Sequence, residues 1–266
     1  MQRMMFAVLA LTALVAAAPH RDRPAATADE AGNRMFDFAA PAAAGRDPLA
    51  RHCTADRLWC AQLRRGAAAG SWRFELIRAT GAVRRLDIPP VDGDAERDFT
   101  IWPHLVVARD GTIVAGVLRR KGSSYPNGDM EVTNLILILA EAAGPIHQVA
   151  EPPMRGYISM PNCLHPGDRR LRFGACLDQA EFTGTLRLDP ATRTGWPRLL
   201  YSARARTFPA RGVLESDLDT QTPLRRSEVR WAIDPTCTYQ RRIRFRARQY
   251  VATDGPFLSC PDYFGH

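Results

Sequence analysis

Arginine side chains recur along two segments that have the residue pattern of β-strands. Side chains alternate between the two faces of a strand, so one face of residues 242–248 would be entirely basic. That face would carry Arg242, Arg244, Arg246 and Arg248. A second segment presents Arg204 and Arg206 on its polar face. Guanidinium groups grip carboxylates, phosphates and sulfates through paired hydrogen bonds. If the two strands are neighbours, we predict an anion-binding stripe; the alternative is a solvated face paired with local acids such as Glu228 or Asp234.

A second candidate site is the polar loop at residues 122–129. It gathers the hydroxyls of Ser123 and Ser124 and the carboxylate of Asp129 between two expected strands, as ligand-binding loops often do. The same residue types are also what an ordinary turn favours. Both interpretations stay open at this point.

The motifs of several enzyme classes are missing. The chain has no G-x-S-x-G, no H-E-x-x-H and no G-x-x-x-x-G-K-[ST], and its single lysine, Lys121, has Leu118 three residues before it, which excludes S-x-x-K. His104 on an expected strand and His165 in a loop are best interpreted as structural. We therefore predict no catalytic residue, no metal ligand and no cofactor.

Six cysteines lie in three sequence-local pairs, which favours three disulfides. The expected bridges are Cys53–Cys60, Cys163–Cys176 and Cys237–Cys260. The alternative, metal ligation, is disfavoured because the chain has no C-x-x-C and no histidine pair at ligand spacing beside these residues. Three bridges would leave no thiol for catalysis.

The first residues have the three parts of a secretory signal. Arg3 precedes an apolar run over residues 4–18 that ends in small residues, which predicts cleavage after Ala17 and a signal peptide at residues 1–17. The run is shorter than the roughly 20 residues of a membrane span. Residues 18–50, rich in Ala and Pro, are expected to form a flexible leader. The mature chain would then be exported, periplasmic or extracellular, without a membrane span.

The rest of the chain is dominated by the two-residue period of β-strands. Trp72, Phe74 and Leu76 alternate with charged residues. Asp110-Gly111 separates two β-rich runs, which is a strong hairpin signal. A further turn signal before the apolar run at residues 135–139 completes an antiparallel meander. We expect an all-β chain of antiparallel sheets.

Five short matches recur in the same order about 100 residues apart and suggest a duplication. They pair residues 85–87 with 187–189, 100–105 with 194–199, 116–118 with 212–214, 131–132 with 228–229, and 149–150 with 251–252. The implied β modules span residues 51–154 and 155–266. They would form two small sandwiches, one pseudo-symmetric sandwich or blades of a small propeller; coincidence in a chain rich in Leu, Arg and Val is the alternative.

The net charge of +8 comes almost entirely from arginine, which suits an anionic partner or follows from a chain-wide compositional bias. Nucleic acid is not expected, because the chain is exported and its basic segments lack interleaved aromatic residues. We predict a non-catalytic envelope protein that binds an anionic or protein partner. The alternatives are a hydrolase acting on envelope material and an inhibitor of an envelope-degrading enzyme.

Overall fold

The structure is a computed structural model that describes residues 28–39, 49–90, 97–125, 128–163, 165–210, 223–254, 257 and 260–264. The expected signal peptide and residues 18–27 and 40–48 of the expected leader lie outside this part of the chain. Every strand pairing in the described residues is antiparallel, and the two α-helices have four residues each. The all-β prediction is confirmed. None of the described helices is long and apolar enough to cross a membrane.

The elements follow one another as sixteen described strands, with three short helical segments after β11. They are β1 (Arg34–Ala39), β2 (His52–Thr54), β3 (Trp59–Arg65), β4 (Trp72–Arg78), β5 (Val83–Ile88), β6 (Arg97–Ile101), β7 (His104–Val107), β8 (Ile113–Tyr125), β9 (Gly128–Ala140), β10 (Ile146–Ala150), β11 (Pro153–Pro161), α1 (Asp168–Leu171), β12 (Leu177–Leu188), β13 (Leu199–Phe208), the 3-10 turn η1 (Arg226–Glu228), β14 (Ala232–Ile233), β15 (Tyr239–Arg246), β16 (Gln249–Ala252) and α2 (Pro261–Phe264).

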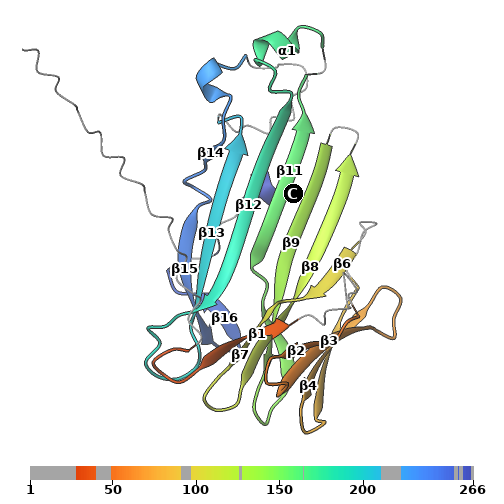
Figure 1. Ribbon diagram of the computed structural model, residues 1–266, viewed down its shortest axis with the longest axis vertical. Helices are drawn as coiled ribbons and strands as arrows, with labels where there is room; N and C mark the ends of the chain where they lie inside the picture. Colours follow the sequence, from red (N-terminus) through yellow and green to blue (C-terminus); the bar gives the residue numbers. More distant parts are fainter. Residues whose placement is uncertain are drawn as a thin grey trace, which may run out of the picture.

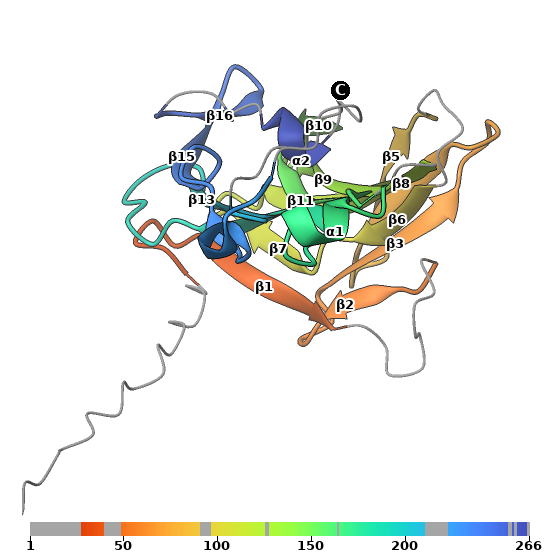
Figure 2. The same ribbon diagram turned by 90° about the horizontal axis from the view of Figure 1, so that it is seen from above.

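All these strands belong to one open, coiled sheet. Its order is β16-β15-β13-β12-β11-β9-β8-β7-β1-β2-β3-β4-β5, with β10 beside β9, β14 beside β13 and β6 beside β8 (Figure 1). Seen from above, β15, β16 and α2 lie on one side of β9 and β11, while β1 and β2 lie on the other (Figure 2). The predicted meander is confirmed as β7, β8 and β9, with Gly111 at positive φ in the first turn.

The β8–β9 hairpin connects two hydrophobic cores. Leu135, Leu137 and Leu139 enter a C-terminal core with side chains of β12, β13, β15 and β16. Ile136 and Ile138 enter an N-terminal core with side chains of β3, β4 and β6. Both faces of this part of the hairpin are therefore buried, which explains its uninterrupted apolar run.

The two halves of β9 also have different neighbours. Its first half pairs with β11, up to Asn134 opposite Pro153, and its second half pairs with β10. A register shift between Pro153 and Arg155 marks the exchange. Between this register shift and the end of the sheet that carries α1, one face of β8, β9, β11, β12 and β13 is open to solvent. On the other face, buried side chains such as Phe182 pack against α2.

Residues 28–39 correct the expected flexible leader. They contain β1, which lies between β7 and β2 and buries Met35 and Phe38. Asn33, fully buried, holds the preceding turn by bonding to the Asp29 carboxylate. The sequence prediction failed here because these two apolar residues find partners only in strands that follow much later.

The three predicted disulfides, Cys53–Cys60, Cys163–Cys176 and Cys237–Cys260, are confirmed, and no described cysteine is free. The first joins β2 to β3, the second closes the loop between β11 and β12, and the third links the segment before β15 to the segment before α2.

The predicted duplication is not confirmed. Residues 85–87 lie in β5, at the end of the sheet order, whereas 187–189 lie at the end of β12, between β11 and β13. Residues 131–132 lie in β9, but Glu228 belongs to η1. Residues 212–214 lie outside the described part. Both cores draw on β8 and β9, so the cores do not divide at the proposed module boundary.

At the end of the sheet, β5 is tied to the turn that follows β9. The Arg84 guanidinium donates hydrogen bonds to the carbonyl oxygens of Glu141 and Ala142, the latter at 2.6 Å. Arg73 on β4 pairs with Asp87 on β5 at 2.6 Å.

Candidate anion-binding site

The two arginine-bearing strands are neighbours, as the stripe hypothesis required. β13 pairs with β15, and Arg204 and Arg206 lie on β13. Arg242, however, stands opposite Leu200, four residues from Arg204 along β13, which corresponds to roughly 13 Å. Arg244 and Arg246 continue away from Arg204. The six predicted arginines therefore do not form one cluster.

Arg248 departs from the predicted strand alternation. β15 ends at Arg246, which pairs with Gln249, so Ala247 and Arg248 form a two-residue turn. Both have positive φ, as this kind of tight hairpin turn requires. Sequence alternation could not show where the strand reverses.

Strand pairing instead brings together arginines that lie far apart in the sequence. Arg120 on β8 pairs with Thr133 on β9, Thr133 with Arg155 on β11, Arg155 with Thr183 on β12, and Thr183 with Arg204 on β13. Directly opposed residues in antiparallel strands share a face. We call Arg120, Arg155 and Arg204 the arginine row.

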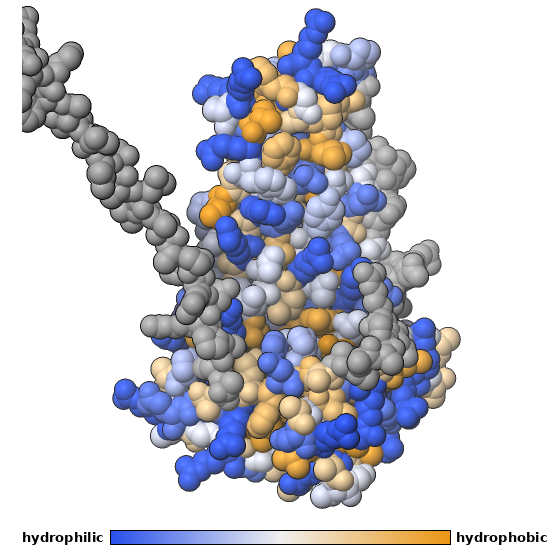
Figure 3. Space-filling model, in the orientation of Figure 1, coloured by the Kyte–Doolittle hydropathy of each residue, from blue (hydrophilic) through white to orange (hydrophobic). Residues whose placement is uncertain are grey.

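The arginine row lies on the solvent face of the sheet. All three arginines are exposed, and on β12 the residues before and after Thr183 are buried on the other face. Successive arginines are two strands apart, about 10 Å between backbones. Figure 3 shows hydrophilic residues across the middle of this face.

The members of the row differ in how they are neutralised. Arg120 pairs with Asp98 on β6 and, at 3.4 Å, with Glu131 on β9. Arg155 approaches Glu131 only to 3.7 Å. For Arg204, no ion pair or hydrogen bond of its side chain is found within the described chain. Positive charge therefore becomes less compensated from β8 towards β13.

Arg206 is occupied differently from Arg204, although it lies on the same strand. Its guanidinium pairs with Glu181 on β12, with Nε 2.7 Å from a carboxylate oxygen. It also lies over the Trp231 ring, 4.4 Å from the ring centroid. Arg206 is thus less free to bind a ligand than Arg204.

A groove of about 960 Å³ adjoins the arginine row. Its lining includes Arg120 and Arg155 on the charged side and the apolar side chains of Trp102, Leu118 and Met154. A groove with this composition suits a ligand that carries both anionic and apolar parts.

The polar loop predicted at residues 122–129 is the end of the β8–β9 hairpin. The backbone of Ser123 pairs with Met130 and that of Ser124 with Asp129. Asp129 also pairs with Ser159, so it lies on the same face as Glu131, two residues farther along β9. Residues 126–127 lie outside the described part.

The two histidines have structural contacts. His104 Nδ1 lies 2.7 Å from the Asp37 carboxylate, across the β1–β7 pairing, as expected for a hydrogen-bonded strand histidine. The backbone N–H of His165 donates to Asp168 at 2.6 Å. The described residues hold no cluster of three or more metal-ligating side chains.

Two carboxylates, those of Asp98 and Glu131, line the groove beside the arginine row. Asp98 and Glu131 both contact the Arg120 guanidinium. Both carboxylates are therefore engaged in ion pairs with a member of the arginine row.

Arg120 and Arg155, two members of the arginine row, are not among the site residues predicted from the sequence. Arg120 sits in a mixed segment beside Arg119 and Lys121, and Arg155 is isolated in a Pro-rich stretch. Only the pairing of β9 with β11 brings them to one level of the sheet.

No protein-family model, curated protein sequence or solved structure matches this chain.

Proposed function

We propose that the chain is an exported, non-catalytic binding protein that holds an anionic partner across the arginine row. The observation that carries the proposal is the row itself: three exposed guanidinium groups, from three non-adjacent strands, at one level of one solvent face. Arg204, which has no acidic partner among the described residues, gives the row its strongest unmet charge.

The geometry favours an extended partner lying across the strands. A chain with anionic groups about 10 Å apart meets successive arginines, and its less polar parts lie over the groove that borders Arg120 and Arg155. Each guanidinium offers two parallel donors to a carboxylate, phosphate or sulfate. Such binding weakens as salt screens exposed charges.

Export is the second part of the proposal. Three disulfides without a free described cysteine fit an oxidising compartment, as do the signal-like residues 1–17. An acidic envelope polymer and the acidic surface of an envelope-degrading enzyme both satisfy the charge requirement. A hydrolase is supported less well, because the two groove carboxylates described above pair with Arg120.

Retention on immobilised dextran sulfate tests the binding site. The double variant Arg155→Ser/Arg204→Ser should elute at lower salt, with roughly tenfold weaker binding. Arg244→Ser/Arg246→Ser removes the same charge from β15, away from the row, and serves as the control. Control retention close to wild type supports the row. Equal loss in both variants would show that net charge alone causes retention, and this would overturn the proposal, as would an unretained wild-type protein.

A further inference from the structure

The end of the molecule that carries α1 combines exposed apolar side chains with arginines. Leu171, Phe173 and Leu177 are 48%, 54% and 46% exposed, and they account for three of the seven large exposed apolar residues in the described chain. Arg169 and Arg170, also exposed, lie on α1 itself. Figure 3 shows hydrophobic and hydrophilic residues side by side at this end. We call these five residues the apical tip.

The backbone holds Phe173 in an unusual conformation. Phe173 follows the end of α1 with φ +49°, in the left-handed region where glycine is favoured. A bulky residue there is uncommon and costs backbone energy. Its side chain nevertheless stays 54% exposed, so burial offsets only part of this cost. A strained residue that leaves so much apolar surface exposed is a reason to look for a partner outside the chain.

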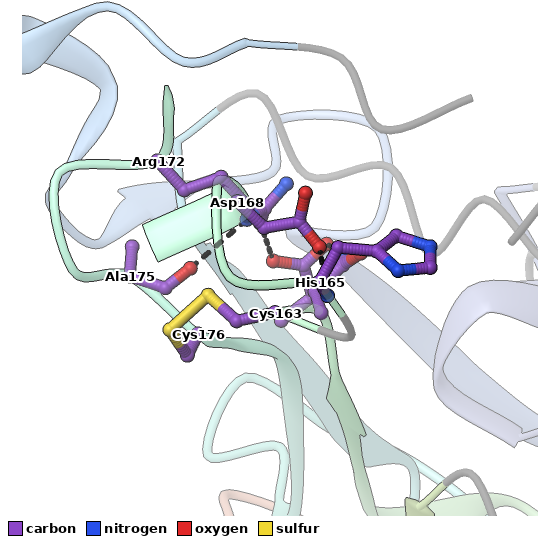
Figure 4. Close-up of a disulfide and its surroundings, with 8 residues drawn as sticks. Cys163, His165, Asp168, Arg172, Ala175 and Cys176 are labelled. Carbon is purple, nitrogen blue, oxygen red and sulfur yellow. Dashed lines mark hydrogen bonds and ion pairs between the residues drawn. A yellow bond between two sulfur atoms is a disulfide. The ribbon is translucent and has the colours of Figure 1, made fainter. Parts of the chain in front are cut away.

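The tip is rigidly supported from below. The Cys163–Cys176 disulfide closes the loop, and the buried Arg172 donates from Nε to the Ala175 carbonyl at 3.0 Å and pairs with the buried Asp178 (Figure 4). A further hydrogen bond, from Leu224 N–H to the Leu171 carbonyl at 3.1 Å, attaches the segment that leads into η1.

The charges at this end are arranged asymmetrically. The acids of the loop point inward: Asp168 is buried and accepts the His165 N–H, and Asp178 is buried against Arg172. Figure 4 shows the His165 ring pointing away from the disulfide. Arg225 and Arg226, adjoining the attached segment, are exposed and add to Arg169 and Arg170.

The other acids described near this end do not cancel its charge. Glu228 accepts the Arg225 N–H at 2.6 Å and is only partly exposed. The exposed Asp129 stands on β9, two strands away from β12, or roughly 10 Å. Among the residues that the structure describes, the outward surface of the apical tip is therefore apolar and positive.

We propose that the apical tip docks onto an anionic phospholipid surface. Apolar side chains that enter the acyl boundary, flanked by arginines that meet lipid phosphates, are the combination that holds proteins at such a surface. A protein partner is a poorer match, because a stable interface needs about 800 Å² from each side and this tip is a small projection at one end (Figure 1). The docking is peripheral and differs from a membrane span.

Co-sedimentation of the full chain with lipid vesicles tests the proposal. We expect binding to phosphatidylcholine vesicles that contain phosphatidylglycerol, little binding to phosphatidylcholine alone, and partial release by salt. Leu171→Ser/Phe173→Ser and Arg169→Ser/Arg170→Ser should each weaken binding roughly tenfold. Leu58→Ser changes an equally exposed residue, 54%, in the turn between β2 and β3, and should bind like wild type.

A depth measurement provides a second readout. Tryptophan fluorescence of Phe173→Trp should gain quenching by brominated lipids over wild type, whereas Leu58→Trp should gain none. Matching far-ultraviolet circular dichroism and matching unfolding midpoints establish that the variants are folded. The proposal would be overturned if wild-type protein bound equally to vesicles with and without phosphatidylglycerol, or if the tip variants bound as strongly as wild type.

This proposal and the arginine-row proposal fail separately. Thr183, at the level of the row, is six residues from Leu177 along β12, roughly 20 Å and beyond the screening length of about 10 Å at 0.1 M salt. Arg155→Ser/Arg204→Ser should therefore keep vesicle binding within about twofold of wild type. A comparable loss in that variant would overturn docking through the tip.

Discussion

The two halves of the β8–β9 hairpin have opposite surroundings. Leu137 in the second half of β9 is fully buried, and its neighbours Ile136 and Ile138 are buried in the other core. Thr133, only four residues earlier, lies between Arg120 and Arg155 on a solvent face. One pair of strands thus supplies both the hydrophobic framework and the candidate binding surface, so changes to the surface need not disturb the framework.

The largest expected effect tests the buried half. Leu137→Ala should lower the free energy of unfolding by about 2–5 kcal/mol, because it removes core contacts and leaves a cavity. Thr133→Ala should stay within roughly 0.5 kcal/mol of wild type. Urea denaturation of both variants measures the contrast, and similar losses in the two would contradict it.

The next largest effect on stability concerns the disulfide at the end of the molecule that carries α1. Cys163→Ser/Cys176→Ser removes the disulfide that closes the loop between β11 and β12. Stability should fall by about 2–3 kcal/mol, mainly because the unfolded chain gains freedom. The midpoint of urea unfolding measures this loss. An unchanged midpoint would mean that the loop is held by Arg172 and Asp178 alone.

A smaller effect on stability, which depends on pH, is expected to distinguish the carboxylates of Glu75 and Glu131. Burial tends to raise the pKa of Glu75, but hydrogen bonds from Gln62, Arg85 and Arg64 outweigh it and hold the pKa below its usual range. A lowered folded-state pKa stabilises the fold above the unfolded pKa of about 4.3, and this contribution is lost as pH falls through the folded value.

Glu75→Gln should therefore reduce stability by roughly 1 kcal/mol at neutral pH and by less in acid. Thermal unfolding across this pH range follows the difference. Glu131→Gln, on the solvent face, is the matched comparison and should change stability less. A Glu75→Gln deficit that persists undiminished in acid would show that packing, not ionisation, is responsible.

The smallest expected stability change belongs to the arginine row. Arg155→Ser/Arg204→Ser should alter the free energy of unfolding by no more than about 0.5 kcal/mol, since Arg204 has no partner to lose in the described chain and Arg155 has only a long ion pair. The same variant should lose dextran sulfate retention. If retention weakens but the variant is also markedly destabilised, the arginine row contributes to stability as the buried half of the hairpin does, and the contrast between the two halves fails.

The features predicted correctly from sequence depend on neighbours in the chain. The Asp110-Gly111 hairpin and the three disulfides each involve nearby residues, so composition and spacing were sufficient. Of the proposed arginine row, only Arg204 belongs to the site predicted from the sequence, and Arg120 and Arg155 do not. Their alignment depends on β9 exchanging one partner for another at Pro153, which no local pattern encodes.

The expected duplication shows the opposite error. Short matches such as Glu131-Val132 and Glu228-Val229 are similar in sequence, yet one lies in a long strand and the other begins in a 3-10 turn. Tertiary surroundings decide the conformation of such short segments. Met35 and Phe38 show the same influence in the other direction, because pairing with β2 and β7 orders a stretch that its composition predicts to be flexible.

The contacts of Arg84 have a consequence for how copies of this protein meet one another. An unpaired strand edge invites a strand from a second molecule, and continued addition produces aggregates. At β5, the guanidinium of Arg84 engages carbonyls of the turn after β9, and charged Arg85 and Asp87 follow on the strand. At the opposite end of the sheet order, β16 lies against β10. The edge formed by β5 therefore carries charged side chains and a guanidinium contact, which disfavour pairing with a strand of a second molecule.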